Sequence, residues 1–121
     1  MVRFQGNDAE VTRGETFVFV VNYGTELPEG TVARFAVKRK LTDLKCVFEQ
    51  DVEVPADGRA VFAMDTEETW KLKPMTYVYD VRLIIPHEGE ADEVRNPMMP
   101  GALHVLPAVA GLNERGEEDG E

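Results

Sequence analysis

Few residues of this chain could take part in catalysis, and the sequence keeps them apart. The two histidines are His87, inside a polar run, and His104, inside an apolar run that is typical of a strand. Catalysis needs a nucleophile or an acid–base set held together in a pocket. We therefore expect neither histidine to be catalytic, and we predict that the chain is not an enzyme.

The single cysteine, Cys46, indicates a structural role. It alternates with Phe48 in a run that predicts a strand, so we expect a small buried hydrophobic side chain and not a reactive thiolate. One cysteine cannot close an intrachain disulfide, so the apolar core alone has to hold the domain together.

Acidic residues gather beside His87 and could suggest a site for a hard cation. They are Glu88, Glu90, Asp92 and Glu93. Their spacing lacks the central glycine and the terminal glutamate of a calcium-binding loop. The sequence also has no glycine-rich phosphate loop, no CxxC pair and no HExxH motif. We expect a solvated loop here without a metal ion, and we expect the protein to use no cofactor.

Charge and hydropathy restrict the possible partners. The chain has 121 residues and a net charge of −10, whereas nucleic acid and anionic membranes bind a surplus of lysine and arginine. No apolar run approaches the ~20 residues that span a bilayer, and the N-terminal residues lack the apolar stretch of a signal peptide. The sequence predicts synthesis in the cytoplasm and binding to neither nucleic acid nor membrane.

The length suits one domain with one core. We expect residues 1–110 to form that domain and residues 111–121 to form an acidic, flexible, solvating tail. Five acids and one arginine give the tail −4 of the net charge of −10, which leaves −6 for the folded body. These residues are Glu114, Glu117, Glu118, Asp119, Glu121 and Arg115.

Hydrophobic residues repeat mostly with the period of two that predicts β-strands. Strands are expected at residues 15–22, 31–40, 46–54, 59–65, 75–85, 93–96 and 101–107. A hairpin should join the third and fourth of these, a single helical turn should follow Asp65, and residues 86–92 should form a polar hairpin loop. The predicted fold class is all-β, an antiparallel immunoglobulin-like β-sandwich of about seven or eight strands.

Two groups of residues are candidate interfaces. The strand at residues 15–22 carries Val18 and Val20 on the face opposite its core side chains, so either another chain or the N-terminal segment should cover them. The strand at residues 31–40 carries a basic stripe that includes Arg34, Lys38 and Lys40. This stripe either balances nearby acids across a strand pair or docks an acidic partner.

A proline and a leucine precede a strand that opens with tyrosine. Leu72, Pro74 and Tyr77 are the residues concerned. The motif resembles the corner of immunoglobulin-like and fibronectin-like sandwiches, in which a tyrosine hydroxyl bonds back to the loop backbone. We expect Tyr77 to make that hydrogen bond.

A wider resemblance covers roughly residues 4–107. Its parts are Phe4-Gln5-Gly6, residues 30–37, residues 65–83, and the closing Leu103-His104-Val105-Leu106-Pro107. Together they resemble small immunoglobulin-like proteins of tailed bacteriophages and prophages, similar in layout to the N-terminal domain of phage baseplate upper proteins.

That resemblance implies a non-enzymatic structural or accessory protein of the virion, made in the cytoplasm of the bacterial host. Its partners would be other virion proteins or copies of itself, in a homo-oligomer or a larger assembly. The resemblance does not specify the place in the virion, whether tail, baseplate, neck or capsid surface.

Two other classes of function stay open. Trp70 and the tyrosines could form the stacking platform of a carbohydrate-binding or adhesion module of the β-sandwich type, although a lone tryptophan near a sandwich corner more often packs in the core or at its rim. A metal-dependent enzyme on a sandwich scaffold would require bound metal in the purified protein.

Overall fold

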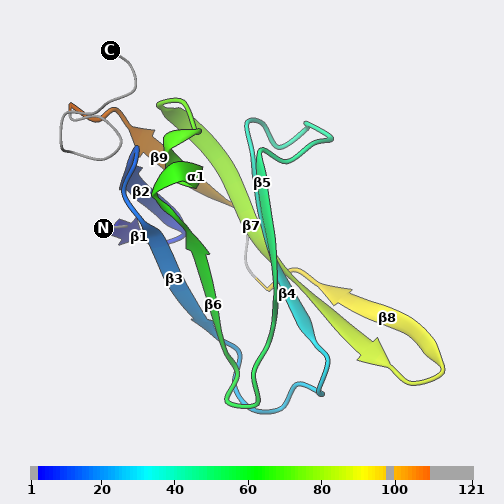
Figure 1. Ribbon diagram of the computed structural model, residues 1–121. Helices are drawn as coiled ribbons and strands as arrows, with labels where there is room; N and C mark the ends of the chain where they lie inside the picture. The colour runs from blue at the N-terminus through cyan, green and yellow to red at the C-terminus, as the bar shows by residue number, and fades with distance from the viewer. Residues whose placement is uncertain (1–2, 98–99, 110–121) are drawn as a thin grey trace.

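The computed structural model describes residues 3–97 and 100–109 (Figure 1). Almost all regular structure in these residues is β, which confirms the predicted all-β class. The elements, in chain order, are β1 (Arg3–Gln5), β2 (Asp8–Thr12), β3 (Phe17–Asn22), β4 (Val32–Lys38), β5 (Phe48–Glu53), β6 (Arg59–Met64), α1 (Thr66–Trp70), β7 (Met75–His87), β8 (Glu90–Arg95) and β9 (Gly101–Leu106).

The strands form two sheets of very different size. The larger sheet has the order β1-β2-β9-β7-β4-β5, and β8 also pairs with β7. The smaller sheet is the antiparallel pair of β3 and β6. The expectation of a wholly antiparallel sandwich is wrong at one place, because β2 and β9 run parallel. Two strands so far apart in sequence are not joined by a hairpin, so nothing local fixes their direction.

The strand order is that of an immunoglobulin-like sandwich. In such a domain, strands G, F and C form one sheet that faces strands B and E, and variable-type domains extend the first sheet with C′. Here β9, β7 and β4 lie side by side, β5 extends them, and they face β3 and β6.

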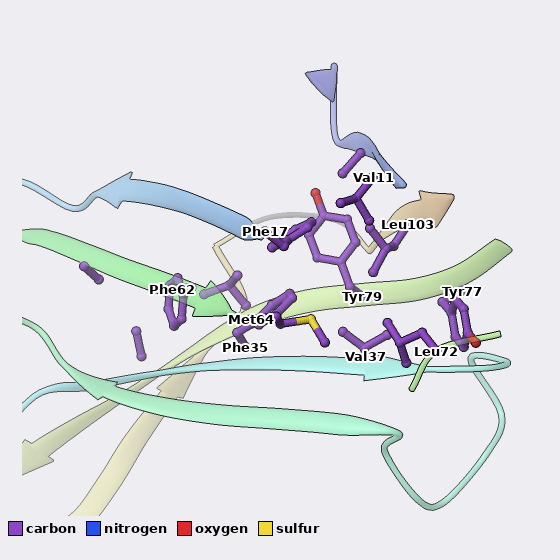
Figure 2. Packing of buried hydrophobic residues seen from close by; sticks show 14 of the residues in the cluster. Val11, Phe17, Phe35, Val37, Phe62, Met64, Leu72, Tyr77, Tyr79 and Leu103 are labelled. Carbon is purple, nitrogen blue, oxygen red and sulfur yellow. The ribbon is translucent and has the colours of Figure 1, made fainter. Parts of the chain in front are cut away.

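Aromatic side chains fill the space between the two sheets (Figure 2). The rings of Phe17 and Phe35 stack with their centroids 5.8 Å apart, and Phe35 lies 5.7 Å from Phe62. The long strand β7 contributes alternate buried residues along its length, among them Tyr79 and Val81. Burial of such side chains is the main favourable term in folding.

The predicted hairpin of residues 46–65 is wrong. β5 belongs to the large sheet and β6 to the small one, so the chain crosses between layers at residues 54–58. Two backbone hydrogen bonds guide this crossing, from Tyr23 N–H to Gly58 O at 2.8 Å and from Val54 N–H to Thr31 O at 2.9 Å. Gly58 has a φ of +80°, and a Cβ there would overlap the carbonyl of Gly24.

The polar hairpin loop predicted at residues 86–92 is present but shorter, because only Glu88 and Gly89 lie between the two strands. β7 continues to His87, and β8 begins at Glu90 and pairs back along it. The resulting hairpin projects from the body of the sandwich in Figure 1. β8 contains most of the strand predicted at residues 93–96 but begins earlier, at Glu90. It is exposed on both faces, with only Val94 as a large apolar residue, so its first residues give no period-two signal.

The helical turn after Asp65 is present as α1. The Asp65 side chain accepts a hydrogen bond from Glu68 N–H at 2.8 Å, and the Glu68 side chain accepts one from Asp65 N–H at 2.8 Å. This reciprocal capping box starts the helix, which ends at Trp70.

The corner that follows α1 has the hydrogen bond expected from the sequence. Leu72 is buried, Pro74 is exposed, and the hydroxyl of buried Tyr77 donates to the carbonyl of Lys73 at 2.9 Å. Tyr23 differs, because its buried hydroxyl has no hydrogen-bond partner among the described residues, and burial raises the pKa of Tyr23 to about 12.

These two tyrosines form a matched pair for a stability experiment. Tyr77→Phe should lower the free energy of unfolding by about 1–3 kcal/mol, because the Lys73 carbonyl loses its partner. Tyr23→Phe removes a hydroxyl that is buried without a partner, so it should leave stability unchanged or raise it. Urea unfolding of both variants measures the difference, and equal midpoints would contradict the corner hydrogen bond.

Candidate protein-interaction surfaces

The outer face of the small sheet is apolar and open to solvent. Val18 is 42% exposed, Val20 is 44% exposed, and Val61 of the neighbouring strand is 50% exposed. Val61 lies directly opposite Val20 in the β3–β6 register. Sequence analysis identified the two valines of β3 but missed Val61, although Val61 and Ala63 alternate with the core residues of β6 just as Val18 and Val20 do in β3.

The described part of the N-terminal segment does not cover these valines. β1 pairs with β2 at the edge of the large sheet. Its Phe4 meets Phe19, whose ring belongs to the core side of β3, with centroids 5.8 Å apart and an edge-to-face geometry. Phe4 itself is 46% exposed. The sequence left two possible covers for Val18 and Val20, another chain or the N-terminal segment. Residues 3–5 of that segment do not cover them.

The outer edge of β3 is a free edge of backbone. Within residues 3–97 and 100–109, β3 pairs with β6 alone. The N–H of Ala63 donates to the side chain of Gln50 at 3.0 Å, so it points away from β3. Ala63 lies opposite Val18, which makes this a non-hydrogen-bonded pair. The N–H and C=O groups of Val18 and Val20 consequently point away from β6, toward the position that an added strand would occupy.

In the part of the chain that the structure describes, β3 lacks the usual protection of an edge strand. Exposed edges are normally blocked by lysine or other charges, by proline, by a bulge or by a covering segment. β3 reads Phe-Val-Phe-Val-Val-Asn, without charge or proline, and its register with β6 is regular. The edge of β6 differs, because the Gln50 side chain occupies it at Ala63.

The basic stripe lies on the opposite side of the molecule. Arg34 belongs to the outer face of the large sheet and makes two hydrogen bonds to Asp51, Nε to Oδ1 at 2.8 Å and Nη2 to Oδ2 at 3.0 Å. These bonds hold the pKa of Asp51 below its usual range. Glu49 lies 3.6 Å from the same Nε. Arg34 thus takes the balanced, cross-strand role that was one of its two expected roles.

A groove of about 210 Å³ borders this stripe, beneath the β4–β5 connection. Lys38, at the end of β4, lines the groove, as do the exposed side chains of Leu41 and Leu44. Lys40 is exposed at the start of the β4–β5 connection. Cys46 lines the groove as well and is only half-buried, so the prediction of a buried strand residue is wrong. The strand begins at Phe48, after the Val47 N–H has bonded to Val37 O.

The two histidines make separate contacts, both of them exposed. His87 Nε2 lies 2.9 Å from Glu93 Oε1, and Arg95 donates to Glu93 Oε2 at 2.6 Å. The Arg95 bond, with a smaller effect of His87, lowers the pKa of Glu93. His104 Nδ1 contacts the Thr76 hydroxyl at 2.9 Å. In the part of the chain that the structure describes, no three His, Cys, Asp or Glu residues are placed to hold a metal ion.

Trp70, the candidate stacking residue, is half-buried at the end of α1. The Arg13 guanidinium lies over its ring, 4.5 Å from the centroid, and Arg13 Nε also donates to the Trp70 carbonyl at 2.7 Å. A Cβ on Gly14 would meet the same ring at 3.1 Å. Cation–π contact and close backbone packing therefore occupy much of the ring surface that a sugar would need.

Comparison with known proteins adds no family to these observations. No family model matches the chain, and no curated protein matches it in sequence.

None of the helices in the described ranges has the length and apolar character needed to cross a lipid bilayer.

The exposure of Val18 and Val20 predicts how the small sheet tolerates charge. Val18→Lys combined with Val20→Glu should leave the far-UV circular dichroism spectrum at 25 °C unchanged, because neither side chain is in the core. Phe19→Glu is the matched control, since Phe19 packs among core aromatics and its replacement should unfold the domain. Unfolding of the double variant would show that residues of the same chain cover the valines.

Proposed function

We propose that this chain is a non-enzymatic structural or accessory protein of a bacteriophage virion, which works by binding other virion proteins or copies of itself. The observation that carries the assembly part of the proposal is the open outer face of β3 and β6. Val18, Val20 and Val61 form an apolar surface there, beside a strand edge without charge or proline. Apolar patches and unpaired edges on a folded domain mark sites of protein contact.

The fold itself supports a role in binding. A rigid sandwich offers strand edges and loops as contact surfaces, and addition of a strand to an exposed edge is a common mode of protein recognition. The resemblance of residues 4–107 to small immunoglobulin-like phage proteins supplies the virion as the setting. Antibody labelling of particles in electron micrographs distinguishes a place in the tail, baseplate, neck or capsid surface.

The aromatic residues give little support to the carbohydrate-binding alternative. Tyr77 and Tyr79 are buried, Tyr23 is packed against the core, and Arg13 lies over the Trp70 ring. Sugars bind proteins by stacking on exposed aromatic faces. A glycan array decides between the two functions, because an assembly protein should bind no saccharide on it.

The proposal predicts that the chain is a component of purified phage particles. Particles induced from the strain that encodes it should retain the protein through density-gradient purification, as measured by quantitative mass spectrometry and by antibody labelling in electron micrographs. The copy number per particle should be a fixed multiple that matches the symmetry of one virion part. Loss of the protein during purification, or a location only in the soluble lysate, would contradict the virion role.

A further inference from the structure

We propose that the partner of the β3 edge is a second copy of this chain, whose β3 pairs antiparallel about a two-fold axis at Phe19. This inference rests on the proposed function, because it names the partner of the same surface. Two small sheets would then join into one continuous sheet in the order β6-β3-β3-β6.

The backbone geometry permits this register. The outward-pointing groups of β3 belong to Val18 and Val20, as the Ala63 to Gln50 hydrogen bond shows. An axis at Phe19 places Val18 opposite Val20 of the second copy, so that residues with outward-pointing groups face each other. That is the condition for hydrogen-bonded pairs in an antiparallel ladder. The unpaired backbone groups of both copies are thereby satisfied.

The side chains also match in this register. On the outer face, Val61 and Val20 of one copy continue into Val18 and Ala63 of the second copy, which makes an unbroken apolar row across four strands. The symmetry repeats the row in the opposite direction. In the flanking rows, Asn22 comes opposite Thr16, so polar residues meet polar residues.

Neighbouring registers match less well. An axis at Val18 would set Val20 against Thr16, and an axis at Val20 would set Val18 against Asn22. Either shift would place a valine beside a polar side chain at each end of the interface. Cross-strand apolar pairs stabilise a sheet relative to mixed ones, so the axis at Phe19 is favoured.

Aromatic residues on the core side of β3 also favour a second copy of β3 as the partner strand. Phe4 is 46% exposed and touches Phe19 at the open side of the sandwich. With the axis at Phe19, the two Phe19 residues become neighbours, and each Phe4 lies beside that pair. A second copy therefore adds apolar contacts at the edge on both faces of β3.

The absence of charge from β3 suits a copy of an acidic protein. Each chain has a net charge of −10, so two copies repel each other over most of their surface. β3 is a stretch where two copies approach without bringing like charges together. Added salt screens the remaining repulsion, so the dimer should tighten as ionic strength rises.

Disulfide trapping between single-cysteine variants tests the partner and the register together. All variants carry Cys46→Ser, and Val18→Cys carries an affinity tag so that its mass differs from that of Val20→Cys. Opposite residues of a hydrogen-bonded pair have Cα atoms about 5.5 Å apart, which a disulfide can span, whereas diagonal positions at roughly 7–8 Å are poorly placed. Mixed and oxidised, the two variants should give mainly the cross-linked dimer of intermediate mass.

The controls separate this pairing from chance contact. Each variant oxidised alone should give little cross-linked dimer, and Val94→Cys, on the exposed strand β8, should give little with either partner. The Cys46→Ser parent should sediment as a dimer, and Val18→Lys with Val20→Glu should convert it to a folded monomer by sedimentation velocity and circular dichroism.

Three results would overturn the inference. These are a parent protein that sediments as a monomer at every concentration, equal cross-linking of Val18→Cys or Val20→Cys alone, and cross-linking of Val94→Cys at the same yield. If the purified chain is monomeric but is found in phage particles, the second copy is the wrong partner and the virion role stands. If the chain dimerises as described but is absent from particles, the virion role fails and the β3 pairing stands.

Discussion

Phe35 lies on the inner face of β4 and touches aromatic rings from both strands of the small sheet. Its centroid is 5.8 Å from Phe17, 5.2 Å from Phe19 and 5.7 Å from Phe62. A two-stranded sheet is at best marginally stable by itself in water. β3 and β6 therefore hold together as a sheet because these rings pack against β4 and β7, and the edge that β3 presents to solvent depends on the same contacts.

That dependence accounts for one face of β3 and leaves the other to be explained. One face must be aromatic to anchor the small sheet, yet the other face is also apolar, with Val18 and Val20 in the positions where a solvated strand would carry polar residues. The large sheet shows the ordinary arrangement on its outer face, where Arg34 is bonded to Asp51. The candidate interface residues predicted from sequence thus lie on opposite sides of the molecule, and the valine surface is the one that residues 3–97 and 100–109 leave uncovered.

Alternation in the sequence predicts which way side chains point, but it does not predict which strands are neighbours. The faces of β3, β4 and β7, the capping box of α1 and the Tyr77 corner all follow from local patterns. The assignment of β5 and β6 to one hairpin failed because Pro55 to Gly58 serves equally well as a hairpin turn and as a crossing between layers. The sequence indicates only the last part of β8, at residues 93–96, because the residues of this strand are exposed on both faces and alternate weakly. Within the described residues, the free edge of β3 arises because β3 pairs with β6 alone, and no local pattern reveals which strands pair.

β2 and β9 are far apart in the sequence, yet they pair in parallel from Ala9 opposite Leu103 to Thr12 opposite Leu106. The hydroxyl of Tyr79 reinforces the junction by donating to the Asn7 carbonyl at 2.6 Å. During synthesis, β2 leaves the ribosome early. Its β1 edge can pair at once, but the edge that pairs with β9 has no partner until β9 has been made. The β2–β9 pair therefore forms late, because the ends of a long intervening segment have to meet and this closure costs conformational entropy. If synthesis stalls before β9 has been made, the edge of β2 that includes Ala9 stays unpaired and can pair with a strand of another chain.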